Sequence, residues 1–267
     1  MGEKQILFIG AGRMATAIAG GMVKKGFAAK NLKAYDVSSA AAAEFTKVTG
    51  VAACTSGVAE LVAAADVALL AVKPQYLAEA LAPVDLSEKL VISILAGIPL
   101  KRLFELTGSS RLVRVMPNTP ALVGEGASVY TMYQPLEEAE TALVLSILES
   151  MGTVDALPEH LFDAVTGLSG SGPAYVLELI QALADSGVML GLPRNVALRL
   201  SAQTVFGSAK LQMVTQTHPI VLRDQVISPG GTTAQGVAAL DEGAFRAVIA
   251  RAVAQAAARS AELGNVK

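Results

Sequence analysis

The sequence predicts an α/β fold in the first half of the chain, a doubly wound parallel sheet, and an all-α fold in the second half. Short aliphatic runs alternate with helical patterns over the first half, as in a parallel sheet with helices on both faces. These runs are too continuous for a sheet with one solvated face, and strand patterns stop near residue 157. We therefore expect a sheet domain at residues 1–157 and a helical domain at residues 158–267.

Seven segments of the first domain have the pattern of buried strands. They are QILFIG (5–10), LKAYD (32–36), VAAC (51–54), DVALLAV (66–72), LVISIL (90–95), RLVRVM (111–116) and SVYTMY (128–133). Helical patterns lie between most of them, beginning with residues 14–25. Residues 136–152 form an amphipathic helical pattern, the short stretch TVDAL follows, and no strand is expected after it.

The second domain has helical patterns at about 159–167, 173–187 and 193–215, and in two more segments between about 233 and 263. Pro173 and Pro193 stand where first-turn prolines belong, and Gly187 and Gly191 stand where helices end. The segment YVLELIQALADSGVML is apolar around most of its circumference, so it must be enclosed on all sides. Because one small helical domain would struggle to cover that surface, we expect a homo-oligomer with its interface in this domain.

The composition argues against several classes of partner. The chain has 21 basic and 23 acidic residues and a formal net charge of -2, which argues against a nucleic-acid footprint or a polybasic membrane patch. The stretch VAELVAAADVALLAVKPQ is broken by Glu60, Asp66 and Lys73, so it falls short of the about 18 apolar residues that span a membrane. The N-terminus carries no export signal, and Cys54 is the single cysteine. We expect a cytoplasmic protein that acts on a small molecule.

The stretch GAGRMA at residues 10–15 directly follows the first strand and opens the first helix. Its spacing, Gly-x-Gly-x-x-Ala, is typical of a Rossmann-type dinucleotide site. The first glycine permits a tight turn, the second lets a pyrophosphate approach the backbone, and the free N–H groups of the helix start face the anion. The expected cofactor contacts here are Gly10, Ala11, Gly12, Arg13 and Met14.

Asp36 closes the second strand, where an acidic residue usually accepts hydrogen bonds from the adenosine ribose and disfavours a 2′-phosphate. Ser38 and Ser39 follow at once, and these serines and Arg13 are able to contact such a phosphate. Asp36 is explained equally well as a helix N-cap. The sequence therefore predicts NADPH or NADH as the cofactor and leaves the preference open.

Two further strand ends supply candidate cofactor contacts. The segment AVKPQ (71–75) leaves the fourth strand at the carboxyl edge of the sheet, where doubly wound folds bind their ligands. Its candidates are Val72, Lys73 and Pro74, with the proline holding the lysine extended. Asn118, in the proline-bracketed loop MPNTPALVGEG, is positioned to reach the nicotinamide. An ordinary strand exit and an ordinary turn explain the two segments as well.

Seven segments together resemble the pyrroline-5-carboxylate reductase family. They are GAGRMA, AVKPQ, RVMPNTPALVGEG (114–126), GLSGSGPAYV (167–176), LGLPR (190–194), HP (218–219) and SPGGTTAQG (228–236). They follow the family's order and spacing over essentially the whole chain. The resemblance implies a Rossmann domain followed by a helical dimerisation domain, assembly into dimers and possibly decamers, and NAD(P)H-dependent reduction of 1-pyrroline-5-carboxylate to L-proline, the last step of proline biosynthesis.

The stretch SPGGTTAQG is the expected substrate loop. Gly230 and Gly231 let successive N–H groups turn inward as an anion nest, a helix that begins near Thr233 points its N-terminus the same way, and Ser228 and Thr232 add hydroxyl donors. These groups suit the substrate carboxylate. By the resemblance, Thr233 reaches the ring nitrogen and is the catalytic residue. From composition alone, the same stretch is a proline–glycine turn with a threonine N-cap.

Two other functions are compatible with parts of the sequence. A β-hydroxyacid dehydrogenase shares the domain plan but typically needs a lysine on the first helix of its second domain, and GPAYVLELIQALADSG contains none. A non-catalytic nicotinamide-binding regulator would have little use for a carboxylate cradle. His160 and His218 are isolated in the sequence, so no metal site is expected. A protonated imine is already electrophilic, so the reaction needs no strong acid or base.

Overall fold

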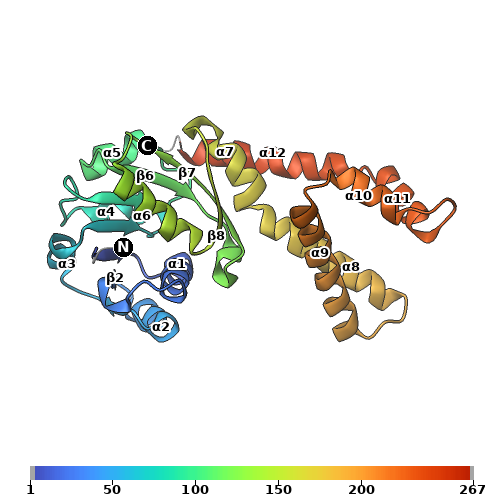
Figure 1. Cartoon of the computed structure of the whole chain (residues 1–267), viewed down its shortest axis with the longest axis horizontal. Coiled ribbons are helices and arrows are strands. Elements are labelled where there is room, and N and C mark those ends of the chain that lie inside the picture. The colour runs from blue at the N-terminus through green and yellow to red at the C-terminus, as the bar shows by residue number, and fades with distance from the viewer. Residues whose placement is uncertain (1–3, 265–267) are drawn as a thin grey trace. The chain divides into compact units, whose positions relative to one another are not determined.

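The structure is a computed structural model that describes residues 4–264 (Figure 1). The chain divides into two compact units. The first unit runs to Ser171 and takes in the chain again from Gln255, whereas the second unit is Gly172–Ala254. All strands of the described residues belong to the first unit, and the second unit contains helices and the turns between them.

Within residues 4–264 the sheet has eight strands in the order β3-β2-β1-β4-β5-β6-β7-β8. Neighbouring strands are parallel except for β6 and β7, which are antiparallel. The bounds are β1 (Ile6–Ile9), β2 (Leu32–Tyr35), β3 (Ala52–Cys54), β4 (Val67–Leu70), β5 (Leu90–Ser93), β6 (Leu112–Met116), β7 (Gly126–Met132) and β8 (Gly152–Ala156). The seven strands that the sequence predicts are present.

Helices cover both faces of this sheet, as a doubly wound fold requires (Figure 1). Ile6 and Phe8 of β1 pack in a core with α1 (Arg13–Lys24), α2 (Ser39–Thr49) and α6 (Glu138–Glu149). Leu7 and Ile9 alternate to the other face, in a core with α3 (Val58–Ala64), α4 (Leu77–Leu81) and α5 (Leu100–Thr107). Because β1 is buried on both faces, its sequence is continuously apolar.

Strand β8 is the element of the sheet that the sequence did not reveal. It forms the sheet edge beside β7 and carries half-buried and exposed residues, GTVDA, in place of an aliphatic run. The antiparallel pairing of β6 with β7 was also unexpected, because the alternation of elements predicted a parallel sheet. This pairing places the carboxyl end of β7 beside the start of β6, at the edge of the sheet opposite to the carboxyl ends of β1, β4, β5 and β6.

Residues 159–170 do not form the single helix that the sequence predicts at about 159–167. They form a 3₁₀ turn at Glu159–Leu161, the short helix α7 (Phe162–Val165) and a π-helical turn at Thr166–Gly170. The remaining helices are α8 (Gly172–Met189), α9 (Arg194–Thr215), α10 (Pro219–Val226), α11 (Thr232–Glu242) and α12 (Phe245–Gly264). Four of them match predicted helices, whereas α10 was not expected, and the predicted helix end at Gly187 lies inside α8.

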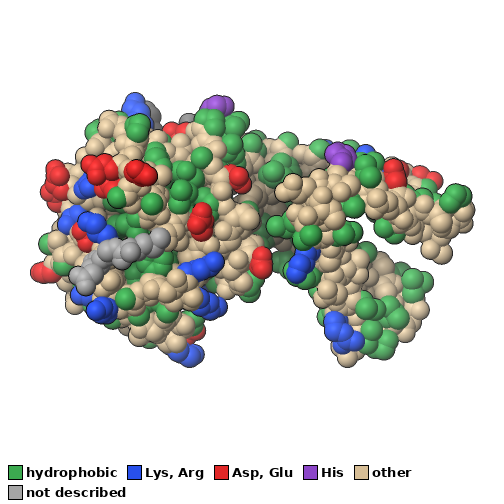
Figure 2. Space-filling model, viewed as in Figure 1, with side chains coloured by type: hydrophobic (Ala, Val, Ile, Leu, Met, Phe, Trp, Pro, Cys, Tyr) green, Lys and Arg blue, Asp and Glu red, His purple; other side chains and the backbone are tan. Residues whose placement is uncertain are grey.

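The helical unit buries few of its own side chains. Within Gly172–Ala254, all of which the structure describes, the buried residues are Ala184, Ala197 and Ser201. Large apolar side chains are exposed along its helices, and hydrophobic atoms recur over this unit in Figure 2. Exposed apolar surface of this extent is typical of an interaction site. Among the described residues, no helix combines the length and the hydropathy that a membrane crossing requires.

Candidate functional site

Gly10 directly follows β1 and has a conformation that favours glycine, with φ at +108°. A Cβ atom at this position would lie 2.7 Å from the carbonyl carbon and oxygen of Ala71 and 2.8 Å from the amide nitrogen of Val72. The Gly10 N–H donates to the Tyr35 carbonyl at 2.8 Å. The start of the glycine-rich loop therefore lies against the ends of β2 and β4, at the carboxyl edge of the sheet.

Gly12 is the N-cap of α1 and has different surroundings. Its φ of -73° suits any residue, yet nothing lies within 4 Å of the place where a Cβ would stand. The cap has no side-chain hydrogen bond, and the first turn of α1 contains no acidic residue. The first N–H groups of this twelve-residue helix therefore face open space, with the positive end of the helix dipole behind them. This arrangement fits a dinucleotide pyrophosphate.

The residues around Gly12 divide between packing and solvent. Ala15 is fully buried, which lets α1 approach the sheet. Ala11 is also buried, whereas Met14 is half-buried against the same core. Arg13 is exposed and makes no ion pair with any described residue. Arg13 is therefore a solvent-exposed cation beside this loop.

Asp36 binds the glycine-rich loop directly. Its Oδ2 accepts a hydrogen bond from the Ala11 N–H at 2.8 Å, and its Oδ1 accepts one from the Ser38 N–H at 2.9 Å. The N-cap of α2 is Ser38, whose Oγ accepts from the Ala41 N–H. Asp36 is therefore not the N-cap of α2, which was the alternative explanation of this residue. The carboxylate instead fixes the distance between the glycine-rich loop and the end of β2.

The segment after β4 lies at the same edge of the sheet. Lys73 has extended backbone and an exposed side chain, and Pro74 begins a 3₁₀ turn at Pro74–Tyr76. Val72 is half-buried and packs against the core formed with α3, α4 and α5. The structure thus brings Val72, Lys73 and Pro74 to the strand end beside Gly10. Their contact with a cofactor remains a prediction.

The side chain of Asn118 has three hydrogen bonds to protein groups. Its Nδ2 donates to the carbonyl oxygen and the Oγ of Ser169, at 3.2 and 3.3 Å, and its Oδ1 accepts from the Ala127 N–H at 2.9 Å. The amide therefore connects the end of β6 to the π-helical turn at Thr166–Gly170. Its proposed contact with the nicotinamide is untested, but its role in holding this turn is evident.

Ser169 and its π-helical turn also belong to this edge of the sheet, and the sequence analysis did not select them as site residues. The signal in the sequence was the repeated glycines and serines of GLSGSG. A Cβ on Gly170 would lie 2.4 Å from Cε of Met116, so the turn packs closely on the end of β6. Turns of π-helix inside helices are frequent at functional sites. The strand end, Asn118 and Ser169 form one hydrogen-bonded unit.

The predicted substrate loop lies in the second compact unit. The Gly231 N–H donates to the Ser228 carbonyl at 3.0 Å, and Gly230 has φ at +70°, so Ser228–Gly231 forms a tight turn with proline at its second position. Helix α11 begins at Thr232, with Gly231 as its N-cap and no side-chain cap. Its first N–H groups are therefore free to bind an anion. Thr232 is exposed and Thr233 is half-buried.

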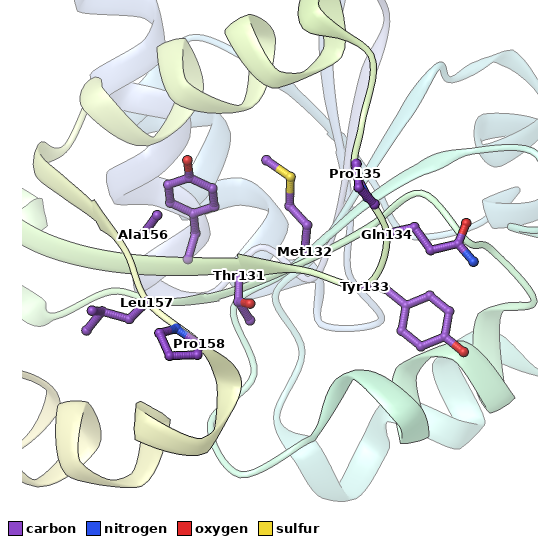
Figure 3. A pocket seen from close by; sticks show the side chains of 9 residues that line it. Thr131, Met132, Tyr133, Gln134, Pro135, Ala156, Leu157 and Pro158 are labelled. Carbon is purple, nitrogen blue, oxygen red and sulfur yellow. The ribbon is translucent and has the colours of Figure 1, made fainter.

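Two cavities of the sheet unit lie away from these residues. One, of about 500 Å³, is lined by residues 130–135 and 156–158, where β7 and β8 end (Figure 3). Figure 3 shows Met132 and Thr131 on opposite sides of β7. The other, of about 130 Å³, is lined largely by charged residues that include Lys4, Asp66 and Arg111. Both lie at the edge of the sheet opposite to Gly10, so neither is the predicted cofactor site.

Known proteins match this chain over nearly its full length. The family described as pyrroline-5-carboxylate reductase dimerisation matches residues 159–263, and the family described as NADP oxidoreductase coenzyme F420-dependent matches residues 5–97. Pyrroline-5-carboxylate reductase of Arabidopsis thaliana is 45% identical over 262 residues, which cover 97% of this chain and 95% of that protein. The Escherichia coli K12 enzyme is 38% identical over 268 residues, with 98% and 99% coverage.

Solved structures give the same result. Plasmodium falciparum pyrroline carboxylate reductase, whose crystal structure has NADP bound, matches with a TM-score of 0.88 and 34% identity, over 98% of this chain and 98% of that chain. The Coxiella burnetii pyrroline-5-carboxylate reductase matches with a TM-score of 0.89 and 32% identity, over 99% of this chain and 100% of that chain. The likeness therefore includes both compact units.

Proposed function

Because the chain belongs to the pyrroline-5-carboxylate reductase family, we propose that it catalyses the NAD(P)H-dependent reduction of 1-pyrroline-5-carboxylate to L-proline. The observation that carries the proposal is 38–45% identity to such reductases over almost the whole chain. The glycine-rich loop and the strand ends beside it supply a dinucleotide site in one unit. The free start of α11 supplies an anion site in the other unit.

The first unit binds and orients the cofactor in this proposal. The N–H groups at the start of α1 hold the pyrophosphate, and the open space at Gly12 admits it. Asp36 faces the adenosine ribose, and Val72, Lys73, Pro74 and Asn118 line the path toward the nicotinamide. A reduced nicotinamide, when bound here, supplies a hydride.

The second unit binds the imine through its carboxylate. The N–H groups around Gly230, Gly231 and Thr232 and the hydroxyl of Ser228 hold this anion. The hydroxyl oxygen of Thr233 accepts a hydrogen bond from the protonated ring nitrogen, which fixes the face of the C=N bond that receives the hydride. The hydride bonds to the imine carbon, the C=N π electrons move to the protonated nitrogen, and the product is the secondary amine of proline. The protein chiefly binds and aligns, so no metal is needed.

The helical region also makes the assembly in this proposal. We place the domain boundary near residue 157, in keeping with the family match to residues 159–263. The name of that family describes dimerisation, and the exposed apolar residues of α8 and α9 fit a dimer interface. We propose a homodimer through this domain, with a decamer as the higher assembly, in the cytoplasm.

An absorbance assay of NADH or NADPH oxidation tests the proposal. Purified protein should oxidise at least one of the two nucleotides when 1-pyrroline-5-carboxylate is added, and proline should form in equal amount. The same protein should not reduce NAD⁺ or NADP⁺ with 3-hydroxy acids, which is the activity expected of a β-hydroxyacid dehydrogenase. Turnover of hydroxy acids without turnover of the imine would overturn the assignment. Nucleotide binding without either turnover would favour a regulator.

A further inference from the structure

We infer that Asp36 makes this chain selective for NADH over NADPH, an inference that rests on the proposed nicotinamide-dependent function. Asp36 follows β2 at the carboxyl edge of the sheet, where the adenosine ribose of a dinucleotide binds. Both of its carboxylate oxygens accept backbone hydrogen bonds, from Ala11 in the glycine-rich loop and from Ser38. The carboxylate is therefore held beside the pyrophosphate site and is not free to rotate away.

The segments on either side of this carboxylate contain no basic residue. The connection from β2 into α2 has the sequence YDVSSAAAA (35–43), and the connection from β3 into α3 has the sequence CTSGVAE (54–60). The residue after Asp36 is Val37, which is 83% exposed. The Oγ of Ser38 already accepts the Ala41 N–H. The charged groups of these two connections are thus Asp36 and Glu60, both acidic.

A 2′-phosphate adds about two negative charges at the ribose, whereas the 2′-hydroxyl of NADH is a hydrogen-bond donor. Each Asp36 oxygen keeps a lone pair beyond its backbone hydrogen bond, which suits hydroxyl donors. Against a phosphate, the same oxygens are repulsive at short range. The opposing cation of the loop is Arg13, which is exposed and has no ion partner among the described residues. A solvated side chain of this kind compensates a fixed carboxylate only in part.

Direct binding measurements test this inference without the imine substrate. NADH and NADPH are titrated into the protein and followed by nucleotide fluorescence, and 5′-ADP is compared with 2′,5′-ADP by calorimetry. We expect NADH to bind about tenfold or more tightly than NADPH, with the same order for the two ADP probes. Asp36→Ser and the isosteric Asp36→Asn should raise the ratio of NADPH to NADH affinity by a similar factor.

Asp85 provides a matched control. It accepts the Ser87 N–H at 2.9 Å, the same local geometry as Asp36 with Ser38, but it precedes β5 at the opposite edge of the sheet. Asp85→Asn should leave the NADPH to NADH ratio unchanged. Equal or tighter binding of NADPH by the wild type, or an unchanged ratio in both Asp36 variants that still fold, overturns the inference. NADH-selective binding by a protein without imine reduction would support the inference and overturn the proposed function.

Discussion

Glu159 and Arg114 form an ion pair with 2.8 Å between Oε1 and a guanidinium nitrogen, although they lie 45 positions apart in the sequence. The side chain of Arg114 is 8% exposed and stacks over the ring of Phe162. The same Glu159 oxygen accepts a hydrogen bond from the Leu100 N–H at 2.7 Å. This N–H stands at the start of α5 and therefore has no acceptor within the helix. One carboxylate therefore joins β6, α5 and the segment that leads into the helical region.

Loss of this carboxylate should destabilise the fold. Glu159→Ala leaves a buried guanidinium without its ion partner and the start of α5 without its acceptor. We expect the free energy of unfolding to fall by about 1–3 kcal/mol, measured by urea denaturation at fixed protein concentration. Glu105→Ala breaks the exposed Arg102–Glu105 pair and should cost no more than about 0.5 kcal/mol. Equal losses in the two variants would contradict the role of Glu159.

Substitutions of the two glycines of the dinucleotide loop should affect different properties, dinucleotide affinity in one case and stability in the other. Gly12→Ala adds a methyl where there is open space, so the melting temperature should hardly change. The same methyl occupies the approach of the pyrophosphate, so dinucleotide affinity should fall about tenfold or more. Gly10→Ala meets the backbone of Ala71 at positive φ, so it should lose about 2 kcal/mol or more of stability. Thermal melts and nucleotide titrations of both variants are the measurement, and a Gly12 variant with unchanged affinity would contradict this placement.

Removal of one hydroxyl should separate substrate binding from cofactor binding. Thr233→Ala should cost about 1–3 kcal/mol of transition-state stabilisation, seen as lower kcat/KM for the imine. Its dinucleotide affinity should stay close to that of the wild type. Thr232→Val keeps the backbone N–H groups and serves as the neighbouring control, with a smaller effect on kcat. A large loss of nucleotide affinity in Thr233→Ala would move this residue out of the substrate site.

The stability of the sheet unit should weaken in acid because of Asp66. Burial raises the pKa of Asp66, but a hydrogen bond from the Gln5 N–H and the ion pair with Lys4 outweigh burial and hold it below its ordinary value. Because the folded pKa is the lower one, the stabilisation is complete above the unfolded value of about 3.9 and is lost as the pH falls through the folded pKa.

Comparison of the wild type with Asp66→Asn tests the direction of this pH dependence of stability. The wild type should be the more stable by up to about 1 kcal/mol near neutral pH, the usual limit for an exposed pair. The difference should shrink as urea denaturation is repeated from pH 6 down to about pH 3. A difference that grows in acid would show that the folded pKa is raised.

A charge placed on α9 should disrupt the proposed dimer. Phe206 is 53% exposed in the single chain, and large aromatic side chains of this kind are typical anchors of interfaces. Phe206→Glu should raise the dimer dissociation constant by about thirtyfold or more, measured by analytical ultracentrifugation. Val48→Glu, on α2 at 58% exposure, is the matched control and should leave assembly unchanged. The same effect from both variants would exclude α9 as the interface.

Local sequence patterns determined much of this molecule. Strand β1 could be predicted because it is buried on both faces and is therefore continuously apolar. The segment GAGRMA could be interpreted because it stands between a strand and a helix. The glycine pattern also predicted the free N–H groups at the start of α1, since that geometry involves only neighbouring residues. Strand β8 was not predicted because it is an edge strand, with one neighbour and little apolar content. Helix α10 was not predicted because it is short and buries no residue.

The sequence by itself determined the fold class, the family and the segments that carry the chemistry, because each depends on the order and spacing of nearby residues. The tertiary structure decided the partners of individual side chains. The amide of Asn118 is engaged by Ser169, 51 positions away, and the carboxylate of Asp36 by Ala11, 25 positions away. No local pattern encodes such pairs, because they arise when strand ends meet at one edge of the sheet.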